Sequence, residues 1–127
     1  MSLGNSYPDR CSVPNTLIVR GVWTGGGAGL SLTRLATDWS RGIRSIVWTA
    51  TGKYLVTFID SGQQLVGHSS DVSSPSGSVK KSVNVIRNSY SAALKTIQVE
   101  TQAAGVLADL LVTEQLICGF VLVTNKP

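Results

Sequence analysis

The sequence predicts an all-β fold: a single antiparallel β-sandwich, or a barrel-like variant, of about seven to eight short strands. Short runs rich in β-branched and aromatic residues alternate with loops of Gly, Ser and Pro, and no long stretch has a helical period. The 127 residues match one domain. Charged residues make up 14% of the chain, well below the roughly 25% of ordinary soluble domains. So little charge suggests a surface covered by neighbouring molecules.

The chain divides into an extended N-terminal arm, residues 1–15, and a β-sandwich domain, residues 16–127. Pro8 and Pro14 stand among small polar residues in the arm, which is unlike a core segment. The first predicted strand is TLIVRGVWT, residues 16–24, and a glycine-rich loop follows it. Residues 30–41 fit either a short helix or a bent strand.

A hairpin is the clearest local signal. The runs 43–49 and 53–60 are separated by Ala50-Thr51-Gly52, a short loop of the kind that joins antiparallel strands. Alternation in the second run places Tyr54, Val56 and Phe58 on one face.

The second half continues the strand pattern. Residues 64–70 form a weaker strand, 70–78 a loop, and 81–88 and 93–101 two further strands. Residues 104–115 predict a loop with at most one helical turn. The last run, 116–124, is apolar on both faces, which places it at the centre of the sandwich or at a subunit interface.

The stretch GVWTGGGAGLSL, residues 21–32, has the outline of a phosphate-binding loop. A Walker loop would end in Gly-Lys-Ser/Thr, but no lysine occurs before Lys53. A dinucleotide fingerprint starting at Gly25 would need glycine or alanine where Leu30 stands, and a helix after it. We therefore predict a bent loop with positive φ angles that lies at a subunit contact or stays mobile and binds no nucleotide.

No residue pattern indicates catalysis. The one histidine, His68, is predicted at the surface, and no Gly-x-Ser-x-Gly elbow is present. We expect no enzymatic activity, cofactor or metal, and a small-molecule ligand is not expected. Cys11 and Cys118 are too far apart for a metal or disulfide framework, so Cys118 is read as a buried apolar residue and Cys11 as free. No signal peptide or membrane span is predicted.

The net charge of +4 comes from Lys and Arg residues scattered along the chain, so we expect no nucleic-acid partner. The three tryptophans could form a carbohydrate or single-stranded DNA platform, although such residues more often anchor a core or a subunit contact. We predict interface positions in the arm, the first strand with its loop, and the segment after it: Tyr7, Pro8, Arg10, Trp23, Gly25, Gly26, Gly27, Trp39 and Arg41.

Two segments resemble one protein family. IVWTATGKYLVTFID, residues 46–60, contains Thr49, Thr51, Gly52, Tyr54, Val56, Phe58 and Asp60 in a recurring pattern, and LADLLVTEQLICGFVLVTN, residues 107–125, adds an Ala-Asp loop, an apolar strand and a closing Asn. Both are similar to small tailed-bacteriophage virion structural proteins of the β-sandwich capsid decoration, or cement, type. The tryptophan-rich first half and the triple glycine do not match that pattern.

This resemblance implies a non-enzymatic virion protein that is assembled in the host cytoplasm. Such a protein would bind the outer surface of a major-capsid lattice, commonly as a homotrimer. The alternative is a tail, fibre or spike base, or a receptor-binding module that recognises carbohydrate.

Overall fold

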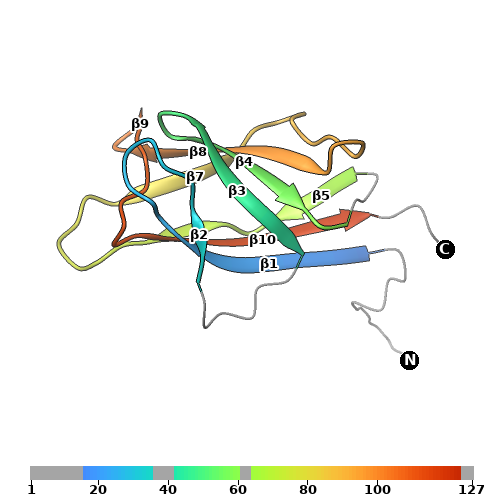
Figure 1. Cartoon of the computed structure of the whole chain (residues 1–127), viewed down its shortest axis with the longest axis horizontal. Coiled ribbons are helices and arrows are strands. Elements are labelled where there is room, and N and C mark those ends of the chain that lie inside the picture. The colour runs from blue at the N-terminus through green and yellow to red at the C-terminus, as the bar shows by residue number, and fades with distance from the viewer. Residues whose placement is uncertain (1–15, 36–41, 61–63, 124–127) are drawn as a thin grey trace, which may run out of the picture.

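The computed structural model describes residues 16–35, 42–60 and 64–123. This part of the chain holds ten β-strands and no helix, arranged as two antiparallel sheets packed together (Figure 1). The predicted all-β sandwich is confirmed. The strands exceed the expected seven or eight because β2, β6 and β9 are pairings of only two or three residues. Their bounds are β1 Thr16–Thr24, β2 Thr33–Arg34, β3 Ile43–Ala50, β4 Lys53–Phe58, β5 Gln64–His68, β6 Asp71–Ser73, β7 Lys81–Val85, β8 Thr96–Ala103, β9 Val106–Leu107 and β10 Gln115–Val123.

The first sheet has the strand order β2-β1-β10-β5, with β6 also paired to β10. β1 and β10 pair over all nine residues of each strand, from Thr16 opposite Val123 to Thr24 opposite Gln115. A register shift between Val121 and Leu122 marks a bulge where β10 meets β5. β10 is an interior strand of this sheet, between β1 on one side and β5 and β6 on the other, and one of its two apolar faces packs in the core.

The second sheet has the order β3-β4-β8-β7, with β9 paired to β8. The predicted hairpin is confirmed as β3 and β4, joined by a tight turn at Thr51 and Gly52. Gly52 has a φ of 68°, and a Cβ there would lie 2.7 Å from two main-chain atoms. Glycine is required at this turn for both reasons.

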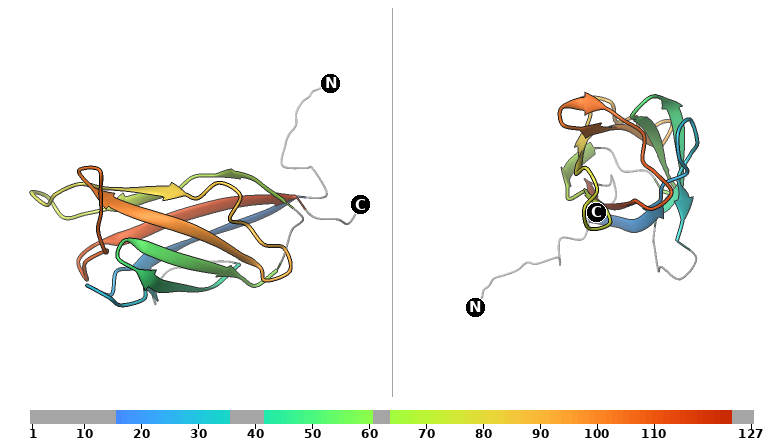
Figure 2. Two further views of the ribbon diagram at one scale, coloured as in Figure 1. Left: turned by 90° about the horizontal axis from the view of Figure 1, so that it is seen from above. Right: turned by 90° about the vertical axis from the view of Figure 1, so that its left-hand side faces the viewer.

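The two sheets face each other (Figure 2), and alternate residues of the long strands form one core between them. Tyr54, Val56 and Phe58 of β4 are buried as predicted. Phe58 meets Phe120 of the opposite sheet edge to face, with ring centroids 5.3 Å apart. Cys118 is also buried, in agreement with its prediction.

Two loop expectations need correction. Residues 104–115 contain the short strand β9 and a turn but no helical turn, and the expected loop 70–78 begins with β6. Both strands are short additions to a strong neighbour, β8 and β10 respectively, and pairing with an existing strand outweighs their weak local signal.

Candidate functional site

The outer faces of the two sheets differ in chemistry. On the central strands of the second sheet, the outward positions are mostly polar, and Leu55 is the one large apolar side chain among them: Lys53, Leu55, Thr57, Thr96, Gln98, Glu100 and Gln102. On the central strands of the first sheet, the outward positions are mostly aliphatic: Ile18, Arg20, Val22, Ile117, Gly119 and Val121. Water thus contacts an apolar face on the central strands of the first sheet, whereas the central strands of the second sheet present mostly polar side chains to it.

The register of β1 and β10 explains how this face forms. Ile18 lies opposite Val121, Val22 opposite Ile117, and between these two aliphatic pairs Arg20 lies opposite Gly119. Ile18 is 48% exposed and Ile117 is 45% exposed. Large aliphatic residues on adjacent strands of an exposed face form a contiguous patch, and such patches mark interaction sites. We call Ile18, Val22, Ile117, Gly119 and Val121 the sheet patch.

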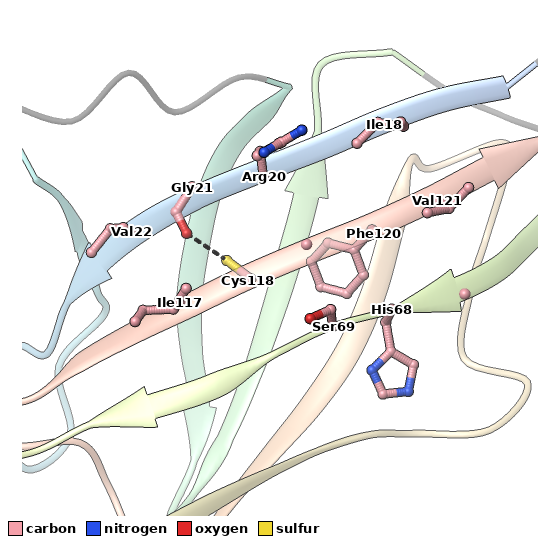
Figure 3. A pocket seen from close by; sticks show the side chains of 12 residues that line it. Ile18, Arg20, Gly21, Val22, His68, Ser69, Ile117, Cys118, Phe120 and Val121 are labelled. Atoms are coloured by element: carbon pink, nitrogen blue, oxygen red, sulfur yellow. Dashed lines mark hydrogen bonds between the residues drawn. The ribbon is translucent and has the colours of Figure 1, made fainter. Parts of the chain in front are cut away.

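The sheet patch is hollowed (Figure 3). Gly119 in β10 and Gly67 in β5 contribute no side chain, so the sheet backbone forms a floor between the aliphatic pairs. The hollow has a volume of about 650 Å³, and its rim also includes Arg20 and Ser69. Its volume is in the range of small-molecule sites, but it opens onto a sheet surface and few polar groups converge on it. A polypeptide side chain suits this shape.

A cation sits at the rim of the hollow. Arg20 is exposed, and among the described residues it takes part in no ion pair. The aliphatic sheet patch is therefore bordered by one positive charge, which no carboxylate of the described residues pairs with.

Asp109 connects three segments at the end of the sandwich opposite Thr16 and Val123. The main-chain N–H of Gly29 donates to Oδ2 at 2.9 Å, and Oδ1 accepts from the Trp48 indole N–H at 2.9 Å and from the Gly52 N–H at 2.7 Å. One carboxylate thus ties the glycine loop, β3 and the hairpin turn to the 108–114 loop. Burial disfavours the charged form, but the bonds from Gly52 and Gly29 outweigh it and hold the pKa of Asp109 below its usual value.

Glu114 anchors the other end of the same loop from inside the protein. Its side chain is 1% exposed and forms an ion pair with Lys81, with Oε1 and Nζ 2.6 Å apart. The Leu111 N–H also donates to Oε1 at 2.8 Å, and the Ser74 hydroxyl donates to Oε2 at 3.1 Å. Burial raises the pKa of Glu114, but the interactions with Leu111, Lys81 and Ser74 lower it by more. The pKa of Glu114 is therefore below its usual value. Both carboxylates act as structural ties.

A second exposed apolar surface lies on this loop end. Leu30, Leu111 and Val112 are 50 to 65% exposed. Their loops lie side by side, because Gly27 donates to the Leu110 carbonyl at 3.0 Å and Gly25 donates to the Glu114 carbonyl at 2.8 Å. We call these three residues the loop-end patch.

The glycine loop is docked on its own chain. A Cβ on Gly25 would lie 2.1 Å from the Leu111 carbonyl oxygen, so this position needs glycine for close backbone approach. Gly27 and Gly29 have φ angles of 95° and 73°, which confirms the predicted positive φ. The space that a Cβ would occupy at Gly25 and Gly26 is therefore filled by residues of this chain. A subunit contact at this loop remains a prediction.

Trp23, one of the predicted interface positions, is 4% exposed and packs in the core. Its position three residues from Arg20 places it on the opposite face of β1, and this signal was available in the sequence. Tyr7, Pro8, Arg10, Trp39 and Arg41 lie outside the described residues.

The sequence reasoning missed most of the sheet patch. The two-faced apolar pattern was recognised for 116–124 but not for β1, where Ile18 and Val22 alternate with the core residues Val19 and Trp23. The same two-faced pattern identifies both strands.

Other sites can be assessed from the described ranges. They contain no group of three or more His, Cys, Asp or Glu residues placed to hold a metal ion. His68 is exposed, in line with its prediction. Within these ranges no helix could cross a membrane. Comparisons with protein-family models, curated proteins and solved structures find no match to this chain.

Proposed function

We propose that this protein is a non-enzymatic structural component of a tailed-phage virion, a cement protein that binds the outer surface of a major-capsid lattice as a homo-oligomer. The observation that carries the proposal is the pair of separate exposed apolar surfaces on a small, weakly charged domain. One surface lies on a sheet face and the other on the loop end. A protein held between its own copies and a second component needs two such surfaces.

The two segments that carry the sequence resemblance are in contact in the structure, which supports the proposal. Gly52 and Tyr54 belong to the first quoted segment, and Asp109 and Leu110 belong to the second. Asp109 accepts from the Gly52 N–H at 2.7 Å, and the Tyr54 hydroxyl accepts from the Leu110 N–H at 2.9 Å. The two segments therefore form one structural unit, although about 50 residues separate them.

Stabilisation would follow from mass action. A protein that binds the intact shell but not its broken pieces shifts the equilibrium toward the shell. Symmetric copies add their individual contacts, so that weak binding by one copy becomes firm attachment by the oligomer. We assign the loop-end patch to the lattice because its loops lie at the Thr24–Gln115 end of the β1–β10 pair, away from the strand ends at Thr16 and Val123.

The alternative function, a carbohydrate-binding receptor module, has less support. Trp23 is in the core, and Trp48 packs against the core while its indole N–H bonds to Asp109. The two described tryptophans thus offer no shared stacking surface.

Co-sedimentation of the purified protein with capsids that lack it tests the function. The wild-type protein should pellet with capsids and raise their disruption temperature. Val112→Asp, at a position that is 65% exposed, should reduce binding at least tenfold. Leu94→Asp is the control, since Leu94 is 71% exposed in the β7–β8 connection at the opposite end and should bind normally. No binding by the wild-type protein would refute the cement function, and glycan binding in its place would establish the alternative.

A further inference from the structure

The hollow of the sheet patch suits a protruding side chain. Its floor is Gly119 and Gly67, and the Ile18–Val121 and Val22–Ile117 pairs form its two walls. A two-fold axis through the patch would place one hollow against another and leave both unfilled. An extended segment carrying a large side chain would fill it and cover the aliphatic walls.

The chain contains a segment of suitable composition. The 15 residues before Thr16 include Leu3, Tyr7, Pro8 and Val13, and their one acidic residue is Asp9. Aromatic and aliphatic side chains match the hollow and its walls, and a carboxylate matches Arg20 at the rim. The apolar side chains of the segment therefore complement the sheet patch, and Asp9, which is followed by Arg10, offers one carboxylate to Arg20.

Length also permits the contact. Fifteen extended residues span about 50 Å, whereas the nine residues of β1 span about 30 Å. The segment joins β1 at Thr16, two residues before Ile18. It can therefore cross a complete sheet patch on an adjacent molecule.

The chain direction favours a neighbouring molecule. β1 starts at Thr16 and runs into the sandwich, so the chain would have to reverse direction just before Thr16 to cover its own sheet patch. Proline disfavours the helical region for the residue before it and directs that residue to extended backbone. Val13 precedes Pro14 and is itself β-branched, and both effects oppose a reversal there.

We propose that the N-terminal segment, residues 1–15, of one copy occupies the sheet patch of a second copy and links the homo-oligomer. This deepens the proposed function, since it rests on the self-association included there, and it names the contact between copies. The lattice contact at the loop-end patch is separate. The experiment therefore uses the purified full-length protein without capsids, so that the two proposals can fail independently.

Disulfide trapping between two distinguishable chains tests the contact. A tagged Cys11→Ser/Ser69→Cys chain is mixed with untagged wild-type protein, which supplies Cys11, and the mixture is treated with diamide. Ser69 is an exposed rim residue, whereas Cys118 is 3% exposed and protected from the reaction. We expect a tagged–untagged dimer, because a bond between Cys11 and the new thiol at position 69 can only join two chains.

The control places the new thiol on the other sheet. Gln98→Cys is exposed on the polar outer face of β8 and should give at least tenfold less mixed dimer. Equal yields from both positions would mean random collision and would overturn the proposal. A single chain carrying both Cys11 and Ser69→Cys that closes on itself as a monomer would also overturn it, because the segment would then cover its own sheet patch.

Filling the hollow provides an independent measurement. A Cβ on Gly67 meets no atom within 4 Å, so the side chain of Gly67→Leu starts in open space and is expected to fill the hollow. We expect at least a tenfold rise in the dissociation constant of the oligomer by sedimentation equilibrium, with Gln98→Leu unchanged. An unchanged constant for Gly67→Leu, with its folded spectrum retained, would show that copies associate through another surface and would overturn the proposal.

Discussion

Asp109→Asn isolates the role of charge in the loop end. The substitution keeps the size of the side chain but replaces one acceptor oxygen with a donor NH₂. Three N–H groups, from Gly29, Trp48 and Gly52, converge on the two native oxygens. The best orientation of the amide keeps its oxygen toward Trp48 and Gly52. Its NH₂ then faces the Gly29 N–H, and that bond is lost.

The expected cost follows from these three bonds. A hydrogen bond to a charged group contributes roughly 1.5–3 kcal/mol and a neutral one about 1 kcal/mol. Asparagine converts two charged bonds into neutral ones and removes the third. Because Asp109 is only partly buried, the low end of these values applies. We expect a loss of about 2 kcal/mol in the free energy of unfolding.

Urea unfolding at pH 7 measures this loss, and the indole N–H resonance of Trp48 reports the local change. The control is Asp60→Asn, since Asp60 is exposed and its carboxylate has no hydrogen bond with the described residues. The control should change stability by less than about 0.5 kcal/mol, as is usual for surface substitutions. If Asp109→Asn is equally mild, or if the Trp48 resonance does not move, the carboxylate does not tie the loops together.

Three more outcomes follow from the same end of the molecule. Glu114→Gln should cost about 3 kcal/mol in urea unfolding at pH 7, because Lys81 is left buried without its counter-charge; a cost below 1 kcal/mol would contradict this. The lowered pKa values of Glu114 and Asp109 stabilise the fold above their ordinary values of 4.5 and 3.8. Stability should therefore fall as the pH drops through the lower folded values, less steeply in Glu114→Gln, and parallel pH curves would disprove it. Gly25→Ala should destabilise by at least about 2 kcal/mol through backbone overlap, while Gly67→Ala, which meets open space, should unfold like the wild type.

Strand pattern predicted the sandwich well. β4 alternates cleanly, so Tyr54, Val56 and Phe58 identify the core face without ambiguity. β1 has apolar residues on both faces. Only the charged residue Arg20 indicates which set of alternate residues faces the solvent. The burial of Trp23 was missed for this reason.

The contacts of Asp109 could not be predicted from pattern. Its partners Gly29 and Gly52 lie 80 and 57 residues away, and both are loop residues without periodicity. Their convergence depends on how three loops meet after the sheets have packed. No repeating pattern in the sequence indicates which loop residues will meet, whereas the alternation of apolar residues does indicate how strands pair.

The pairing of Thr16 with Val123 also determines how the domain responds to force. Both described ends of the chain leave the same end of two adjacent antiparallel strands. Tension between them would load the hydrogen bonds of this ladder one pair at a time, because those bonds lie across the strands. β1 would then separate from β10 by sequential unzipping of the ladder, which requires little force. A domain built in this way is expected to yield when it is pulled by these two strand ends.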